Sequence, residues 1–182
     1  MNINMDTRRG PSFSMSNRLA RVAWGLVECT LFRWSPRPLH AWRAFLLRLF
    51  GARVGRNVHV YPGVRIWAPW NLAIGNDTGC ASGTILYSQG KINLGNRVVV
   101  SQGAHLCTGT HDYNTCGFPL RTRPITVGDD AWIAAEAFIH PGVRIGCGTV
   151  IGARAVVTAD MPDWTVCAGH PCQPLKPRIR PD

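Results

Sequence analysis

The sequence is poor in charge and has no long apolar run. Only 16% of its 182 residues are charged, against about 25% in a typical soluble domain, whereas 46% are hydrophobic. This balance excludes a largely disordered chain, because so many apolar residues can form a core. A stretch of about 20 apolar residues is also missing, which excludes a membrane-spanning helix. The length fits one domain with a short appendage.

Signals for disulfides and for secretion are missing as well. The chain has seven cysteines, an odd number, and contains no CxxC pair. Its first residues, MNINMDTRRGPS, hold no apolar core of the kind that a secretory signal needs. We therefore expect reduced cysteines in a cytoplasmic protein rather than a disulfide-stapled secreted domain.

Acidic residues are scarce, and the resulting positive charge is unevenly spread. Twenty Lys and Arg oppose ten Asp and Glu, for a net charge of +10. Nine arginines lie within residues 1–53, beside only Asp6 and Glu28. A nucleic-acid binder usually spreads its cations over a recognition surface. The clustering argues against nucleic acid as a partner and favours an anionic membrane or a phosphorylated substrate.

What the sequence does contain is a repeat of six residues. From Val54 onward an aliphatic residue returns at every sixth position, with two slips of two residues and one insertion, residues 112–126. Fourteen of these fifteen positions hold Ile, Leu or Val. The positions are Val54, Val60, Ile66, Ile74, Cys80, Leu86, Leu94, Val100, Leu106, Val127, Ile133, Ile139, Ile145, Ile151 and Val157. A glycine follows the first member of each group of three: Gly55, Gly75, Gly95, Gly128 and Gly146.

A period of six fits neither an α-helix nor an alternating strand. It is typical of a solenoid with three short flat faces, in which aliphatic side chains point inward and glycine lets the backbone bend at a corner. Neighbouring coils would pair as parallel strands about 4.8 Å apart. We therefore expect an all-β fold, a parallel β-helix of about five coils. The predicted coils are residues 54–73, 74–93, 94–111, 127–144 and 145–162.

The other residues flank this repeat. Residues 1–15 are expected to be disordered or extended, and residues 163–182 to form a C-terminal tail. Residues 16–53 form a basic, aromatic-rich segment with apolar residues at helical spacing. The solenoid itself occupies residues 54–162, including the inserted loop 112–126.

The N-terminal segment is predicted to contain two helices. They span about residues 17–33 and 39–50, are separated by SPRP, and the first has Ser16 as its N-cap. Since the open end of a solenoid needs a cap, we favour an apolar helix face that covers the prism. A basic helix with Trp and Leu opposite also suits peripheral contact with the inner membrane, and both interpretations stay open.

The repeats resemble a known family. Hexapeptides such as VGDDAW, IAAEAF, IHPGVR, IGCGTV and IGARAV, followed by VVTADMPDWTVCAGHPCQPLK, are similar to the hexapeptide-repeat acyltransferases. Maltose, galactoside and nodulation-type sugar O-acetyltransferases form the most similar group. Within it, LFRWSPRPLHAWRAFLLRLFGARVG and LCTGTHDYNTCGFPL resemble the colanic acid biosynthesis acetyltransferases. The resemblance implies a left-handed β-helix, a homotrimer, and acetyl-coenzyme A bound in the groove between neighbouring prisms.

One residue matches the catalytic base of this family. His111 ends the third predicted coil, directly before the insertion, and GTHDYN resembles the family's catalytic histidine motif. Long loops on a rigid scaffold often carry function, and a histidine can take a proton from an attacking hydroxyl at neutral pH. Asp112, which stands where many relatives have Pro, is a candidate to orient the His111 ring. The alternative is that both are ordinary polar loop residues.

The resemblance also implies a cofactor site, whereas the acceptor side departs from the family, since Gly83 stands where galactoside-type relatives have the Asn that holds the acceptor hydroxyl. Coenzyme A contacts match Trp132, Ala135, Ala153 and Thr158, and its phosphates need cations, for which Arg154 and Lys176 are candidates. These positions could equally serve packing of the repeat or a solvated tail. The candidates for binding the acceptor are Ser82, Gly83, Tyr87, Tyr113, Asn114, Arg121 and Arg123. The two arginines suit a phosphate or a uronate.

We therefore predict an acetyl-CoA-dependent O-acetyltransferase for a sugar hydroxyl in exopolysaccharide biosynthesis, with a nucleotide-, lipid- or oligosaccharide-linked acceptor. Direct transfer would need no metal. One alternative is a non-catalytic hexapeptide scaffold. Another is a zinc enzyme like the γ-carbonic anhydrases, although the pair His105 and His111 is one residue longer than their HxxxxH spacing. We expect a cytoplasmic location, peripheral at the inner membrane.

Overall fold

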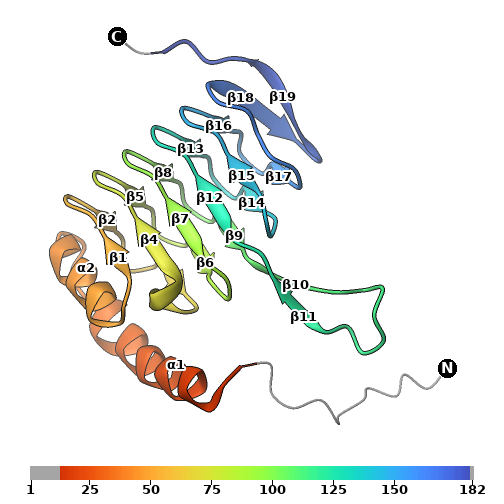
Figure 1. Ribbon diagram of the computed structural model, residues 1–182. Helices are drawn as coiled ribbons and strands as arrows, with labels where there is room; N and C mark the ends of the chain where they lie inside the picture. Colours follow the sequence, from red (N-terminus) through yellow and green to blue (C-terminus); the bar gives the residue numbers. More distant parts are fainter. Residues whose placement is uncertain (1–12, 181–182) are drawn as a thin grey trace.

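The computed structural model describes residues 13–180 and shows a three-sided parallel β-solenoid (Figure 1). Helices cover one end of the prism, and a pair of C-terminal strands lies at the other. Most of residues 1–15, for which we expected no regular structure, lie outside the described residues. No helix in the described part of the chain is long and apolar enough to cross a membrane.

Each face of the prism is one parallel sheet. The first face contains β1 (Arg53–Val54), β4 (Leu72–Ile74), β7 (Ile92–Leu94), β12 (Ile125–Val127) and β15 (Arg144–Ile145). The second face contains β2 (His59–Val60), β5 (Gly79–Cys80), β8 (Val99–Val100), β13 (Trp132–Ile133), β16 (Val150–Ile151) and β18 (Thr165–Gly169). The third face contains β3 (Arg65–Ile66), β6 (Ile85–Tyr87), β9 (His105–Cys107), β14 (Phe138–Ile139) and β17 (Val156–Val157). A short 3₁₀ turn, Pro69–Asn71, links the third face to the first.

The predicted interior positions form the core. Fourteen of the fifteen aliphatic positions are buried, and only Val54, on the first coil, is half-buried. Neighbouring coils pair in a fixed register that stacks each aliphatic residue on its counterpart, as Ile74 on Leu94 and Leu106 on Ile139. The prediction of an interior column with a period of six is therefore confirmed.

The solenoid has five complete coils and a partial sixth. After the fifth coil, Met161 forms a parallel bridge with Ile145, and β18 adds a rung to the second face by pairing with β16. β19 (Cys172–Pro177) then returns antiparallel to β18. Much of the expected C-terminal tail, residues 163–182, is thus a rung of the solenoid with a covering strand.

The N-terminal helices cap the first coil. They are α1 (Met15–Val27), a π-helical turn (Glu28–Phe32) and α2 (His40–Leu49). The Trp24 indole Nε1–H donates to the Ile66 carbonyl at 2.8 Å, and Phe32 and Leu47 are fully buried beside it. The N-cap is Ser14, whose Oγ accepts from the backbone N–H of Asn17, so the helix begins one residue before the predicted cap Ser16.

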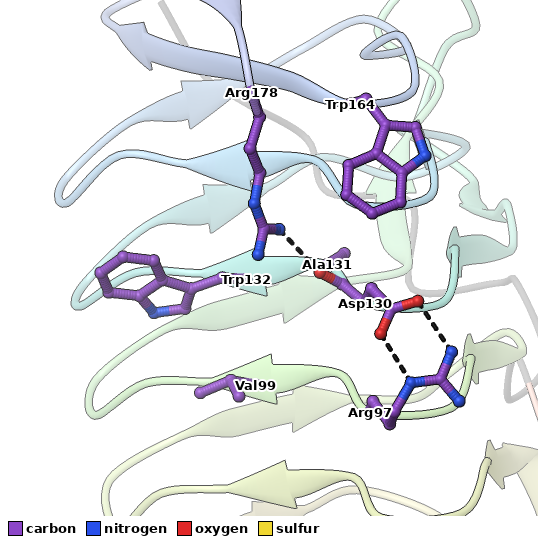
Figure 2. Close-up of a pocket in the computed structure, with 7 residues that line it drawn as sticks. All are labelled: Arg97, Val99, Asp130, Ala131, Trp132, Trp164 and Arg178. Carbon is purple, nitrogen blue, oxygen red and sulfur yellow. Dashed lines mark hydrogen bonds and ion pairs between the residues drawn. The ribbon is translucent and has the colours of Figure 1, made fainter. Parts of the chain in front are cut away.

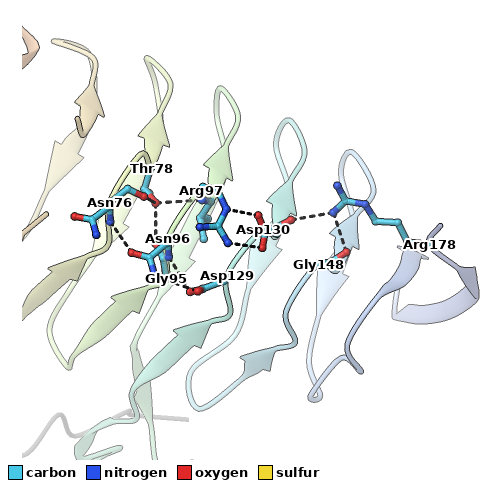
Figure 3. Close-up of polar contacts among 10 residues, drawn as sticks. Asn76, Thr78, Gly95, Asn96, Arg97, Asp129, Asp130, Gly148 and Arg178 are labelled. Carbon is cyan, nitrogen blue, oxygen red and sulfur yellow. Dashed lines mark hydrogen bonds and ion pairs between the residues drawn. The ribbon is translucent and has the colours of Figure 1, made fainter. Parts of the chain in front are cut away.

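A ladder of short polar side chains runs along the corner between the first and second faces (Figure 3). The backbone N–H of Asn76 donates to Asn96 Oδ1 at 2.9 Å, and that of Asn96 donates to Asp129 Oδ1 at 2.8 Å. Each side chain therefore accepts a corner N–H of the preceding coil. At this half-buried corner the backbone N–H groups thus find acceptors within the chain.

The glycine that precedes this ladder is required by close backbone approach. A Cβ added to Gly75 would lie 2.5 Å from the backbone of Gly95 on the next coil, whereas a Cβ on Gly79 would meet only the His59 carbonyl, at 3.9 Å. We expect Gly75→Ala to destabilise the protein by about 1–3 kcal/mol, because the coils must separate. Gly79→Ala, the matched control, should stay within about 0.5 kcal/mol of the parent. Unfolding curves of both variants, recorded at one protein concentration, give these free energies of unfolding. Equal losses in the two variants would mean that the corner at Gly75 tolerates a side chain.

A second prediction concerns Glu28, the one acidic residue of the cap. Its carboxylate accepts the Ile66 backbone N–H at 2.7 Å, and burial raises the pKa of the Glu28 carboxyl above its usual value. Because the folded protein holds this proton more tightly, its stability falls as pH rises from the unfolded pKa of Glu28 through the folded one. Glu28→Gln keeps the acceptor and cannot ionise. We expect its melting temperature to gain on the parent as the pH rises above 4.5, the ordinary value for a glutamate carboxyl, and a widening deficit would contradict this.

Candidate active site

A β-hairpin leaves the prism where the sequence has its insertion. β10 (Gly109–His111) and β11 (Leu120–Thr122) pair antiparallel, with His111 opposite Leu120, and project from the end of the third face (Figure 1). The backbone N–H of Arg123 donates to the Thr108 carbonyl at 2.9 Å and closes the base of the hairpin. The predicted loop 112–126 is thus an ordered hairpin whose last residues already belong to the first face.

The ring of His111 is held by the backbone of its own hairpin. Its Nδ1 lies 2.6 Å from the Phe118 carbonyl oxygen, which can only accept a hydrogen bond. Nδ1 therefore carries the proton, and the lone pair of Nε2 is left for another group. This tautomer is the one that a general base needs.

The carboxylate of Asp112 accepts hydrogen bonds from the turn that follows it. Asp112 Oδ2 accepts from the Thr115 hydroxyl at 3.0 Å, and Oδ1 accepts from the Asn114 backbone N–H at 3.1 Å. These two hydrogen bonds, with Arg121 at 3.6 Å, lower the pKa of the Asp112 carboxyl. We expected Asp112 to orient the His111 ring. In the structure the Phe118 carbonyl orients the ring instead, through its hydrogen bond with Nδ1.

The hairpin and the third face enclose an open pocket of about 440 Å³. His111 lines it together with four of the predicted acceptor residues: Tyr113, Asn114, Arg121 and Arg123. His140 also lines it and was missed by the sequence analysis. The position of His140 in the repeat could have indicated this. It ends the third-face segment of the coil after the insertion, level with Cys107, where the hairpin begins.

The remaining predicted acceptor residues lie elsewhere on the solenoid. Tyr87 belongs to β6, where its ring packs edge-on against Trp67 and His105 and its hydroxyl accepts from Gln89. Ser82 and Gly83 form the exposed corner between the second and third faces. Neither group lines the His111 pocket.

Trp132 lies in a second pocket, on the second face (Figure 2). This pocket has a volume of about 460 Å³ and is flanked by Trp164 and two arginines, Arg97 and Arg178. The Trp132 indole donates to the Ser101 hydroxyl at 2.9 Å, and Arg178 donates to the backbone carbonyls of Asp130 and Gly148. Arg97 and Trp164 had no motif to identify them in the sequence.

The other predicted cofactor residues are spread over neighbouring elements. Ala135, Ala153 and Arg154 lie at the corner between the second and third faces, where Arg154 pairs with Glu136. Thr158 follows β17 on the third face, and Lys176 lies on β19 opposite Val166. One chain therefore does not bring His111 and the predicted cofactor residues into a single pocket.

The described residues contain no group of three His, Cys, Asp or Glu side chains placed to hold a metal ion. His105, one of the two histidines considered for zinc, packs between the Tyr87 and Phe138 rings instead. Burial, and then the nearby charge of Arg65, lowers the pKa of its imidazole.

Comparisons with known proteins agree with this architecture. The chain matches no protein-family profile. It is 42% identical over 167 residues to WcaF of Escherichia coli (strain K12), whose name assigns it to colanic acid biosynthesis as an acetyltransferase, and the match covers 92% of each chain. The structure resembles a hexapeptide-repeat acetyltransferase from Vibrio cholerae with a TM-score of 0.84 and 25% identity, over 92% of this chain and 95% of that one. It also resembles a galactoside acetyltransferase solved with coenzyme A, with a TM-score of 0.84 and 26% identity, over 97% and 91% of the two chains.

The fold and these similarities define a hexapeptide-repeat solenoid of the acetyltransferase class, whose members are left-handed β-helices. The chain belongs to the family of the colanic acid biosynthesis acetyltransferases within that class. The predictions of fold class and of family are therefore confirmed, including the left hand that the repeat period alone could not determine.

The tautomer of His111 can be measured without knowledge of any substrate. We expect ¹⁵N NMR of histidine-labelled protein to show that the neutral form of the His111 ring is protonated at Nδ1, because the Phe118 carbonyl accepts from that atom. The resonance should disappear in His111→Asn and remain in His170→Asn, a change at an exposed turn residue. A His111 signal from the Nε2-protonated form would contradict the geometry.

Proposed function

We propose that the protein is an acetyl-CoA-dependent O-acetyltransferase that modifies a sugar hydroxyl in exopolysaccharide biosynthesis. The names of the similar proteins, an acetyltransferase of colanic acid biosynthesis and a galactoside acetyltransferase with coenzyme A, support this activity. The observation that carries it is the hydrogen bond from His111 Nδ1 to the Phe118 carbonyl, which in the neutral ring leaves Nε2 to accept a proton beside an open pocket.

In the proposed reaction, His111 acts as general base. Bound acetyl-CoA supplies the acetyl group as a thioester. His111 Nε2 takes the proton of the sugar hydroxyl while the hydroxyl oxygen bonds to the acetyl carbon. The Phe118 carbonyl stabilises the imidazolium through Nδ1–H, and His111 returns the proton to the sulfur as the carbon–sulfur bond breaks.

The same pocket supports an anionic sugar as acceptor. Arg121 and Arg123 are exposed beside His111, and guanidinium groups bind phosphate or carboxylate through paired N–H donors. Tyr113 and Asn114 offer hydroxyl and amide groups for sugar hydroxyls. A nucleotide-linked, lipid-linked or oligosaccharide acceptor fits this chemistry. In the second pocket Trp132 offers apolar surface and Arg178 offers charge that fit coenzyme A, whereas Arg97 is already paired with Asp130.

We infer that the working form is a homotrimer. The hairpin with His111 leaves the third face, whereas Trp132 lies on the second face of the same chain. The hairpin tip exposes Tyr113 and Phe118, which a neighbouring prism can cover. Packing the second face of one copy against the hairpin of the next would join the two pockets into one site. We also propose a cytoplasmic location, peripheral at the inner membrane.

Substitution of His111 tests the proposed base. We expect His111→Ala to lower kcat by about 10²–10⁴-fold, the usual contribution of general base catalysis. Release of coenzyme A from acetyl-CoA, followed with a thiol reagent over monosaccharides and nucleotide sugars, is the assay. Acetyl-CoA affinity by calorimetry and trimer mass by light scattering should not change. His170→Ala is the matched control, and full turnover in His111→Ala would overturn the assignment.

A further inference from the structure

The first helix carries a row of large apolar side chains that nothing in the described chain covers. Met15, Leu19, Val22 and Leu26 are each 63–64% exposed, although Leu and Val side chains gain from burial. Their spacing of four, three and four residues places them on one side of α1. We call these four residues the outer stripe.

The outer stripe is opposite the side of α1 that caps the prism. At 100° per residue, Leu26 and Val22 lie about 200° and 160° around the helix from Trp24. Trp24 is the buried contact of α1, and Arg21 lies over the Trp67 ring on the same side. Capping therefore accounts for the inner side of the helix and leaves the outer stripe unexplained.

Further exposed apolar groups extend the surface beyond α1. The π-helical turn inserts an extra residue, so Leu31, five residues after Leu26, continues the stripe and is exposed. The Trp42 indole donates to the Leu31 carbonyl at 3.1 Å and stacks on Phe45, which is also exposed. Trp34, in the loop between the helices, is 81% exposed.

The charge of the N-terminal segment that holds this surface has almost entirely one sign. Residues 13–53 contain seven arginines, and their only acidic residue is Glu28. Glu28 faces inward onto Ile66, and Arg43 is buried in hydrogen bonds to backbone carbonyls. The exposed arginines are Arg18, Arg33, Arg37, Arg48 and Arg53.

This charge decides what covers the stripe. A second copy that docked its own outer stripe here would bring the same arginines together, with no outward acid in residues 13–53 to pair with them, and like charges repel across an interface. An apolar surface with anionic groups at its edge satisfies both the leucines and the arginines. Tryptophans beside such a helix are typical of the interface between lipid headgroups and acyl chains.

We propose that the outer stripe, with Leu31, Trp34 and the flanking arginines, is a docking surface for an anionic lipid bilayer. The helix lies in the plane of the interface, with Leu19, Val22 and Leu26 among the acyl chains and the arginines on the headgroup phosphates. This surface makes the protein peripheral, since none of its described helices can span a membrane.

Vesicle flotation with the full-length protein tests the proposal. We expect binding to vesicles of phosphatidylcholine with phosphatidylglycerol, and much weaker binding to phosphatidylcholine alone. Leu19→Gln with Leu26→Gln should weaken binding on the order of tenfold for each leucine. Arg18→Gln with Arg33→Gln should weaken it about fivefold for each arginine, and only on the anionic vesicles.

The matched control is Leu175→Gln with Ile179→Gln, which removes two exposed apolar side chains at the other end of the prism. It should bind vesicles as the parent does. Far-UV circular dichroism should be unchanged in every variant, because all the altered side chains are exposed. The assay uses no acetyl-CoA, so its result is independent of the proposed activity.

Two outcomes would overturn the proposal. One is equal loss of binding in the control and in the leucine variant, which would mean nonspecific adsorption. The other is absence of vesicle binding by the parent together with a smaller native mass of the leucine variant in light scattering. That result would show that the stripe joins copies of the chain.

Discussion

The structure depends on the backbone hydrogen bonds that join each coil to the next in one register. A coil has no core of its own, because each of its faces is two or three residues wide and encloses only its aliphatic side chains. Stacking makes the core continuous, and stacking is possible only where the backbones meet closely. The backbones of Gly75 and Gly95 lie too close to leave room for a Cβ. At the same corner the side chains of Asn96 and Asp129 accept the backbone N–H groups that lack a partner within the sheets.

The same register explains how the solenoid tolerates a site. The chain leaves the third face after Cys107 and returns at Ile125, whose backbone N–H donates to the Lys91 carbonyl in the correct place on the first face. The insertion of the hairpin therefore leaves the pairing of β12 with β7 in register. Its base is closed by Thr108 and Arg123, so His111, three residues beyond Thr108, is held close to the rigid prism. A catalytic group on a rigid support needs little ordering when substrate arrives.

The interior of the fold could be predicted from the sequence because the period of six is a direct consequence of the register. The contact that positions His111 could not be predicted in this way. Every residue has a backbone carbonyl, so the sequence does not indicate which one accepts from the ring. Asp112 had the chemistry of an orienting residue, but a carboxylate beside a turn binds the nearest backbone N–H and hydroxyl, here those of Asn114 and Thr115. The sixth rung was missed for a related reason, because Cys167 and its neighbours follow no glycine-led hexapeptide.

The first helix shows where an apolar pattern is ambiguous in principle. Trp24 and Leu26 are two residues apart, so they lie on opposite sides of α1, and a sequence rich in apolar residues does not say which side meets the prism. In the structure Trp24, which is buried and hydrogen-bonded to Ile66, lies on the side of α1 that meets the first coil. A capping helix needs only that one apolar side, and a polar outer side would cost the fold nothing. The outer leucines are therefore not needed for capping in the isolated chain. The exposed arginines beside these leucines indicate that the surface which covers the leucines is negatively charged.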